Sequence, residues 1–183
     1  MKKIVYKPYW NYEKEENWLN QMAETGWALC DYTWMKYTFE TCKKGEYVFC
    51  IDLLEKNPGH PESQAFIDMV EDTGIEHVTS YMRWVYFRKK ADGKPFDLYT
   101  DLGSKIRQLQ RINRFWTVLI AAELAIGFSN LSIWSTSQAL EESTNINLYA
   151  GLFLIFIGAL LMTVVYPVRI KIRALMREQR IRE

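Results

Sequence analysis

The feature that most constrains this chain is an apolar run of 21 residues, from Leu148 to Val168, that contains no charged side chain. A helix rises about 1.5 Å per residue, so the run spans roughly 30 Å, the thickness of the hydrocarbon core of a bilayer. The alternative is a buried helix of a soluble protein, but such helices are usually shorter and carry a polar face. The run therefore predicts a transmembrane helix over residues 148–168.

A weaker apolar run, residues 115–134, precedes it and contains one acidic residue, Glu123. Beside such a strong neighbour, this run predicts the first arm of a two-helix transmembrane hairpin. The hairpin should occupy residues 115–168, with its spans over about 115–134 and 148–168 and a short loop between them.

The residues that flank the hairpin are basic on both sides. The segment before the first span and the tail, residues 169–183, are rich in Lys and Arg, whereas the loop carries Glu141 and Glu142 as its charged residues. Basic residues concentrate on the cytoplasmic side of short membrane flanks. We therefore predict a multi-pass protein of the cell membrane with both termini in the cytoplasm. Seven basic side chains are expected to contact lipid headgroups: Lys105, Arg107, Arg111, Arg114, Arg169, Lys171 and Arg173.

The formal net charge of +1 conceals an asymmetry along the chain. Residues 1–102 hold 13 basic and 17 acidic residues, a net charge of −4, and residues 103–183 hold 10 basic and 5 acidic residues, a net charge of +5. Basic runs also occur in proteins that bind nucleic acid, but here the membrane flanks account for them. We expect membrane lipid as a partner and no nucleic acid.

The residues before the hairpin suffice for one small cytoplasmic domain, residues 1–97, followed by a juxtamembrane helix over 98–114. Periodicity predicts strand, helix, two strands, helix and strand in this order. This βαββαβ order is that of a ferredoxin-like α+β domain, an antiparallel four-stranded sheet with two helices on one face. The expected elements are strands over 2–9, 27–42, 47–54 and 76–89, and helices from Asn11 to Gly26 and from about 61 to 73.

The two halves of this domain have similar sequences at the ends of their helices. Residues 19–26 and 66–74 both place Met three positions after a large apolar residue and both end in Gly, with one residue inserted in the second copy. A duplicated unit is what the internal symmetry of the expected fold predicts.

A run of aromatic and acidic residues opens the first expected helix, and shorter aromatic patterns follow in the later strands. The residues concerned are Tyr9-Trp10-Asn11-Tyr12-Glu13-Lys14-Glu15-Glu16-Asn17-Trp18-Leu19, Met22-Ala23-x-x-Gly26-Trp27-x-Leu29, Tyr47-x-Phe49 and Trp84-x-Tyr86-Phe87. Over roughly residues 1–110 they resemble an uncharacterised bacterial family, the domain of unknown function 2812. In that family membrane spans follow a cytoplasmic domain, and the genes often lie near PadR-like transcriptional regulators. The resemblance implies a membrane-attached accessory or regulatory protein in a stress or transport locus, and it transfers no catalytic residue.

The sequence contains no pattern of residues that carries a known chemistry. His60 and His77 have no Cys or His at the spacing of metal ligands. The glycines form no phosphate-cradling loop, and no nucleophile elbow is present. The odd number of cysteines argues against a disulfide framework, so we expect small buried side chains at Cys30, Cys42 and Cys50. We expect no catalytic residue, no metal, no cofactor and hence no enzyme.

The sheet carries more large aromatic residues than a ferredoxin-like domain needs. Its helices cover one sheet face only, so its strands should alternate between apolar and polar side chains. In strands 27–42 and 76–89, large residues instead stand at both odd- and even-numbered positions, so they would point to both faces of the sheet. Either a bulge switches the register within the core, or the open face is covered by a second copy, a partner, a ligand or the juxtamembrane helix. The second alternative makes five residues candidates for an interface: Tyr32, Trp34, Met82, Trp84 and Tyr86.

Glu123 would lie about 12 Å inside the first span, where ionisable groups are costly and commonly functional. It is either protonated, hydrogen-bonded to a polar residue of the second span, or paired with another protein. Small residues would allow the spans to pack closely. The candidates for this contact are Ala121 and Ala125 in the first span and Gly151 and Gly158 in the second.

These observations favour a non-enzymatic, membrane-anchored regulatory or accessory module. Its cytoplasmic domain and hairpin would bind another membrane protein, such as a transporter, or a second copy of the chain, and it would serve a transport or transcriptional-regulator pathway. The alternative is a membrane sensor that binds an amphiphile or a peptide and signals to the cytoplasm.

Overall fold

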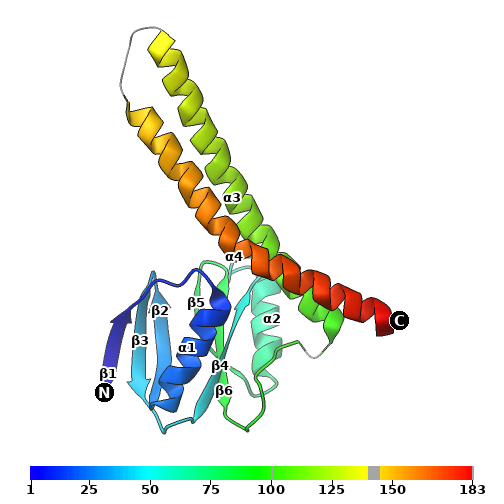
Figure 1. The fold of residues 1–183 in the computed structure, drawn as a ribbon. Coiled ribbons are helices and arrows are strands. Elements are labelled where there is room, and N and C mark those ends of the chain that lie inside the picture. The colour runs from blue at the N-terminus through cyan, green and yellow to red at the C-terminus, as the bar shows by residue number, and fades with distance from the viewer. Residues whose placement is uncertain (100, 140–144, 183) are drawn as a thin grey trace. The chain divides into compact units, whose positions relative to one another are not determined.

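The computed structural model describes residues 1–99, 101–139 and 145–182. The chain divides into two compact units, Met1–Thr100 and Asp101–Glu183, which Figure 1 shows as a β-rich part and a pair of long helices. The mixed α+β class and the two long apolar helices agree with the prediction from the sequence.

The first unit forms two antiparallel sheets of three strands each, ordered β1-β3-β2 and β4-β6-β5. Its elements are β1 (Lys2–Tyr6), α1 (Tyr12–Glu24), β2 (Trp27–Thr33), β3 (Lys36–Thr41), β4 (Tyr47–Leu53), α2 (Pro61–Glu71), β5 (Glu76–Tyr81) and β6 (Trp84–Lys90). Each sheet comes from one β-α-β-β segment, and in each the third strand of the segment lies in the middle. The unit is therefore a tandem repeat.

The two repeats match closely after their helices. Both helices are followed by a glycine with left-handed φ, Gly26 at 91° and Gly74 at 82°, which lie 48 positions apart. The second strand of each repeat contains a register shift, at Cys30 in β2 and at Val78 in β5, again 48 positions apart. The short sequence match at the two helix ends thus marks a structural duplication.

The structure differs from the predicted ferredoxin-like sheet in its number of strands. The stretches 27–42 and 76–89 are each a hairpin, and their turns contain Trp34, Met35 and Met82 with φ of 40°, 62° and 53°. Tight hairpin turns with left-handed residues usually carry Asn, Asp or Gly. Because these residue types are missing here, no turn was predicted. The prediction of one four-stranded sheet is wrong, and two three-stranded sheets take its place.

The hydrophobic core has two parts. The first lies beneath α1 and draws residues from both sheets: Leu19, Ala23, Ala28, Leu29, Tyr37, Phe39, Phe49, Ile51 and Tyr86. The second joins α2 to β6 and consists of Leu54, Ile67, Val70, Val85 and Phe87. Neighbouring residues of a strand point to opposite faces, so α1 and α2 cover opposite faces of the second sheet. Helices on both faces of this sheet, together with the register shifts in β2 and β5, account for the large residues at both odd- and even-numbered positions.

The second unit consists of α3 (Leu102–Ala139) and α4 (Ile146–Arg182), which pack along each other as a hairpin (Figure 1). Each helix is long and apolar enough to cross a membrane. Asp101 accepts a hydrogen bond from the backbone N–H of Ser104 at 2.8 Å and so caps α3. The predicted juxtamembrane helix and first span therefore form one continuous helix. Glu141 and Glu142 of the predicted outer loop lie outside the described residues.

The two helices pack closely at glycine residues. A Cβ atom added to Gly151 would lie 2.9 Å from the carbonyl oxygen of Gly127, and one added to Gly158 would lie 3.0 Å from a leucine side chain of α3. Ala121 and Ala125 were predicted to line this contact but are exposed, whereas Gly127 is buried. The α3 part of the prediction is therefore wrong, because the contact stripe follows another face of that helix.

Candidate functional site

The five residues predicted as an interface fall into two groups. Tyr32, Trp84 and Tyr86 belong to the core beneath α1 or pack against it, and Tyr86 is only 2% exposed. Trp34 and Met82 are each 64% exposed, at the turns of the two hairpins. The structure thus places one of the five in the core, two against it and two on the surface.

The turns that carry Trp34 and Met82 lie close together. The ring centroid of Tyr81, which precedes Met82, is 6.5 Å from that of Trp34. The Thr79 hydroxyl of β5 donates a hydrogen bond to the Asp31 carboxylate of β2 at 3.4 Å. Strands β2 and β5 therefore run side by side with equivalent residues of the two repeats adjacent. We call Trp34, Tyr81 and Met82 the hairpin-tip patch.

A buried carboxylate on α1 joins the two repeats. Glu15 is 7% exposed, and its Oε1 accepts hydrogen bonds from the hydroxyls of Tyr37 at 2.8 Å and Tyr86 at 2.7 Å. Tyr37 lies in β3 and Tyr86 in β6, so this one oxygen bridges the two sheets. Burial raises the pKa of Glu15, and the two tyrosine hydrogen bonds offset part of that rise. Burial and the charge of Glu15 raise the pKa of both tyrosines, which keeps them protonated as donors.

The following turns of α1 bind the edge of β4. Asn20 accepts a hydrogen bond from the backbone N–H of Phe49 at 2.7 Å and donates one to its carbonyl at 3.2 Å. Glu16 accepts one from the backbone N–H of Ile51 at 2.8 Å. Burial raises the pKa of Glu16 to about 7, although that backbone bond acts in the opposite direction. These contacts satisfy an edge that would otherwise be open to pairing with another strand.

The described residues hold no group of three or more His, Cys, Asp or Glu side chains placed to bind a metal ion. His60 caps α2 by accepting a hydrogen bond from the backbone N–H of Glu62 at 3.2 Å. His77 shares a hydrogen bond of 2.8 Å with the Ser80 hydroxyl. Both histidines therefore serve the local fold. The cysteines are unpaired and at least partly buried: Cys30, Cys42 and Cys50.

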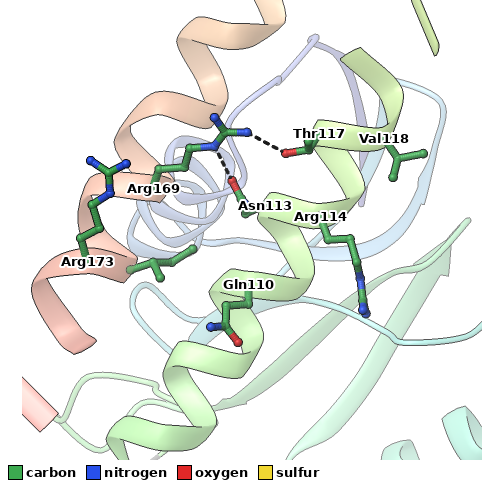
Figure 2. A pocket seen from close by; sticks show the side chains of 8 residues that line it. Gln110, Asn113, Arg114, Thr117, Val118, Arg169 and Arg173 are labelled. Atoms are coloured by element: carbon green, nitrogen blue, oxygen red, sulfur yellow. Dashed lines mark hydrogen bonds between the residues drawn. The ribbon is translucent and has the colours of Figure 1, made fainter. Parts of the chain in front are cut away.

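A groove of about 540 Å³ lies between α3 and α4 (Figure 2). Its polar lining consists of Gln110, Asn113, Arg114, Thr117, Arg169 and Arg173, and its apolar lining of Val118 and Ile172. We call it the arginine groove. Its lining residues include three arginines and no acidic residue, so the groove carries a net positive charge.

Arg169 is held in place across the helix pair. Its Nε donates a hydrogen bond to Asn113 Oδ1 at 3.1 Å, and one of its terminal nitrogens donates to Thr117 Oγ1 at 3.1 Å (Figure 2). Asn113 and Thr117 are four positions apart and so face the same side of α3. Both partners are neutral, so they orient the guanidinium without cancelling its charge.

Three of the seven basic residues predicted to meet lipid headgroups line this groove: Arg114, Arg169 and Arg173. The others lie elsewhere on the two helices: Lys105, Arg107, Arg111 and Lys171. Sequence reasoning missed the polar residues Gln110, Asn113 and Thr117. Their spacing along one helix face, directly before and into the first apolar run, was the signal that could have revealed them.

Glu123 of α3 faces the second helix at a glycine. A Cβ atom on Gly158 would lie 3.9 Å from the Cβ of Glu123, and the Glu123 side chain is half-buried. Within residues 1–99, 101–139 and 145–182, no hydrogen bond or ion pair reaches its carboxyl group. The alternative in which a polar residue of the second span binds it is therefore not found among these residues.

Comparisons with known proteins identify one family. No curated protein and no solved structure shows significant similarity to the chain. A family model described as protein of unknown function (DUF2812) matches residues 11–121, which is more than half of the 183 residues. The match begins at the cap of α1, includes all the later strands, and ends within α3. The chain therefore belongs to the DUF2812 family.

Proposed function

We propose that the chain is a non-enzymatic accessory or regulatory subunit that α3 and α4 anchor in the cell membrane. Both termini lie in the cytoplasm, and the first unit binds another protein through the hairpin-tip patch. The length and apolar character of the two helices support the anchoring, and the basic segments on both outer sides of the hairpin support this orientation.

The hairpin-tip patch is the observation that carries the protein-binding role. Scattered exposed apolar residues are ordinary in soluble domains. Trp34 and Met82, however, occupy left-handed positions, where a residue with a side chain costs roughly 1–2 kcal/mol. Large apolar side chains at such positions in both repeats favour a role other than stability. Trp, Tyr and Met are also enriched at protein interfaces.

The buried acidic groups of the first unit support a binding role over a catalytic one. Glu15 is bound by two tyrosine hydroxyls, and Glu16 is bound by a backbone N–H group. Their raised pKa values arise from burial within the fold. Both groups therefore serve the architecture of the repeats.

The test replaces Trp34 and Met82 together by Asn, which suits left-handed turns. We expect the full-length variant to be at least as stable as wild type but to recover tenfold less of the protein that co-purifies from native membranes, measured by quantitative mass spectrometry. The matched control is Met69→Asn, which removes a 58% exposed apolar side chain from α2 instead. Unchanged recovery with the double variant, or an equal loss with the control, contradicts the proposal.

A further inference from the structure

We propose that the arginine groove binds the phosphate of an anionic phospholipid from the cytoplasmic leaflet. This inference rests on the membrane anchoring of α3 and α4 in the proposed function. It goes beyond general attraction between basic flanks and lipid, because it assigns one site with defined donors.

The donors of the groove suit a phosphate group. Arg114, Arg169 and Arg173 line it, and among the described residues none of the three forms an ion pair with Asp or Glu. A guanidinium carries five N–H donors in a planar fork that matches phosphate oxygens in pairs. Arg169 commits two of its nitrogens to neutral acceptors on α3, which leaves N–H groups and the whole positive charge for a ligand.

The orientation of Arg169 distinguishes this groove from a loose cluster of surface charges. Asn113 and Thr117 hold the guanidinium against α3, so little side-chain entropy remains to be lost when an anion binds. Figure 2 shows Arg169 reaching from α4 toward these two residues. The two neutral acceptors on α3 are therefore part of the site.

The position of the groove in the sequence points to a lipid. Arg114 directly precedes the first apolar run, and Arg169 directly follows the last residue of the second. Both arginines thus lie where the hydrocarbon ends and the headgroups begin. Val118, one turn farther into the apolar run, lines the groove beside them and offers an apolar surface for the start of an acyl chain. Basic pockets between transmembrane helices on the cytoplasmic side bind anionic headgroups in this way.

The volume of the groove favours a headgroup over a bare ion. About 540 Å³ falls within the range of ligand sites of small-molecule size. A phosphoglycerol headgroup carries one negative charge and several hydroxyl groups, and Gln110 on the groove wall supplies both a donor and an acceptor for such hydroxyls.

The experiment measures lipid retention by the full chain purified in a neutral detergent. Dioleoyl phosphatidylglycerol or dioleoyl phosphatidylcholine is added at equal concentration, and bound lipid is counted by native mass spectrometry. We expect the wild-type chain to retain phosphatidylglycerol at least tenfold better than phosphatidylcholine. The pair Arg169→Gln and Arg173→Gln should lose at least nine-tenths of that preference.

Two further variants separate a built site from general charge. Arg177→Gln with Arg180→Gln removes the same charge from exposed positions of the same helix outside the groove, and it should change retention less than twofold. Asn113→Leu changes no charge but removes an acceptor that orients Arg169, and it should reduce retention several-fold. Equal loss in both arginine pairs, or full retention by Asn113→Leu, overturns the proposal.

A competition measurement distinguishes the lipid from free phosphate. Inorganic phosphate at the concentration of the lipid should leave phosphatidylglycerol bound, and full displacement by it would overturn the assignment to a lipid.

Two other measurements test the proposed function independently of the lipid site. A chain recovered in the soluble fraction after carbonate extraction contradicts the anchoring, and unchanged co-purification by the Trp34 and Met82 variant contradicts the protein-binding role.

Discussion

Neighbouring glutamates of α1 have different roles in the first unit. Glu15 bridges the two sheets through tyrosine hydroxyls, and Glu16 holds the edge of β4 through the backbone N–H of Ile51. Burial raises the pKa of both carboxyls, so each retains its proton to higher pH than an exposed glutamate. The stability of this unit should therefore depend on pH in a direction opposite to that of salt-bridged carboxylates.

Glu16 gives the sharper pH prediction. Its folded-state pKa of about 7 lies above the ordinary value of 4.5, so the folded chain binds more protons than the unfolded chain between these pH values. The free energy of unfolding should fall as pH rises from 4.5 to 7, by up to about 3 kcal/mol from this group. Glu16→Gln keeps an acceptor for Ile51 and should flatten the fall. Urea unfolding of the full chain in detergent, followed by tryptophan fluorescence, measures the slope.

The control for that measurement is Glu24→Gln, an exposed position of the same helix. It should keep the wild-type slope. A smaller slope should persist in Glu16→Gln, because burial also raises the pKa of Glu15. Identical slopes for wild type and Glu16→Gln would show that Glu16 does not bind its proton in the folded chain.

At the residue scale, the sequence predicts local contacts and misses distant ones. The start of the first helix lies at Asn11 as predicted, and Asn11 caps it by accepting a hydrogen bond from the backbone N–H of Lys14 at 3.1 Å. Glu15 resembled an ordinary acidic residue in a first helical turn, which suits the helix dipole. Its partners lie 22 and 71 positions away in the chain, so only the tertiary fold reveals that it is buried.

At the scale of elements, glycines set the distance between α3 and α4. A methyl group on Gly151 would lie 2.9 Å from the carbonyl oxygen of Gly127, and backbone atoms cannot move aside without separating the helices. Gly151→Ala should therefore weaken the hairpin and lower the unfolding temperature of the full chain in detergent. The control is Ala121→Leu, which enlarges an exposed residue of α3 and should leave that temperature unchanged. A neutral Gly151→Ala would contradict the packing.

The hairpins of the first unit explain why its sheets were only partly predicted. Periodicity located the stretches that form strands and helices. The sequence match between the two halves corresponds to a tandem repeat in the structure. The hairpin turns were missed because Trp34, Met35 and Met82 are poor turn formers on intrinsic grounds. Whether the strands form one sheet or two depends on which strands pair with each other, and periodicity along the chain does not encode that pairing.

At the scale of the whole molecule, charge separates the two units. Residues 1–100 hold 13 basic and 16 acidic residues, a net charge of −3, and residues 101–183 hold 10 basic and 6 acidic residues, a net charge of +4. The arginine groove lies where the basic segments adjoin both apolar runs, so the proposed lipid site and the proposed orientation in the membrane depend on the same charges. The sequence shows which basic residues flank the two apolar runs. It could not show that three of them share a groove, because that depends on how the two helices pack.

The orientation itself gives the last prediction. Outward transfer of a positive charge against a potential of 100 mV costs about 2.3 kcal/mol, so the basic flanks should stay inside. A cysteine introduced by Ser143→Cys should react with a membrane-impermeant maleimide in intact cells, and one introduced by Ser104→Cys should react only after permeabilisation. The wild-type chain is the control, because its cysteines, all within the first unit, should remain unlabelled in intact cells. Labelling of Ser104→Cys but not Ser143→Cys in intact cells would invert the orientation and place the arginine groove at the outer leaflet.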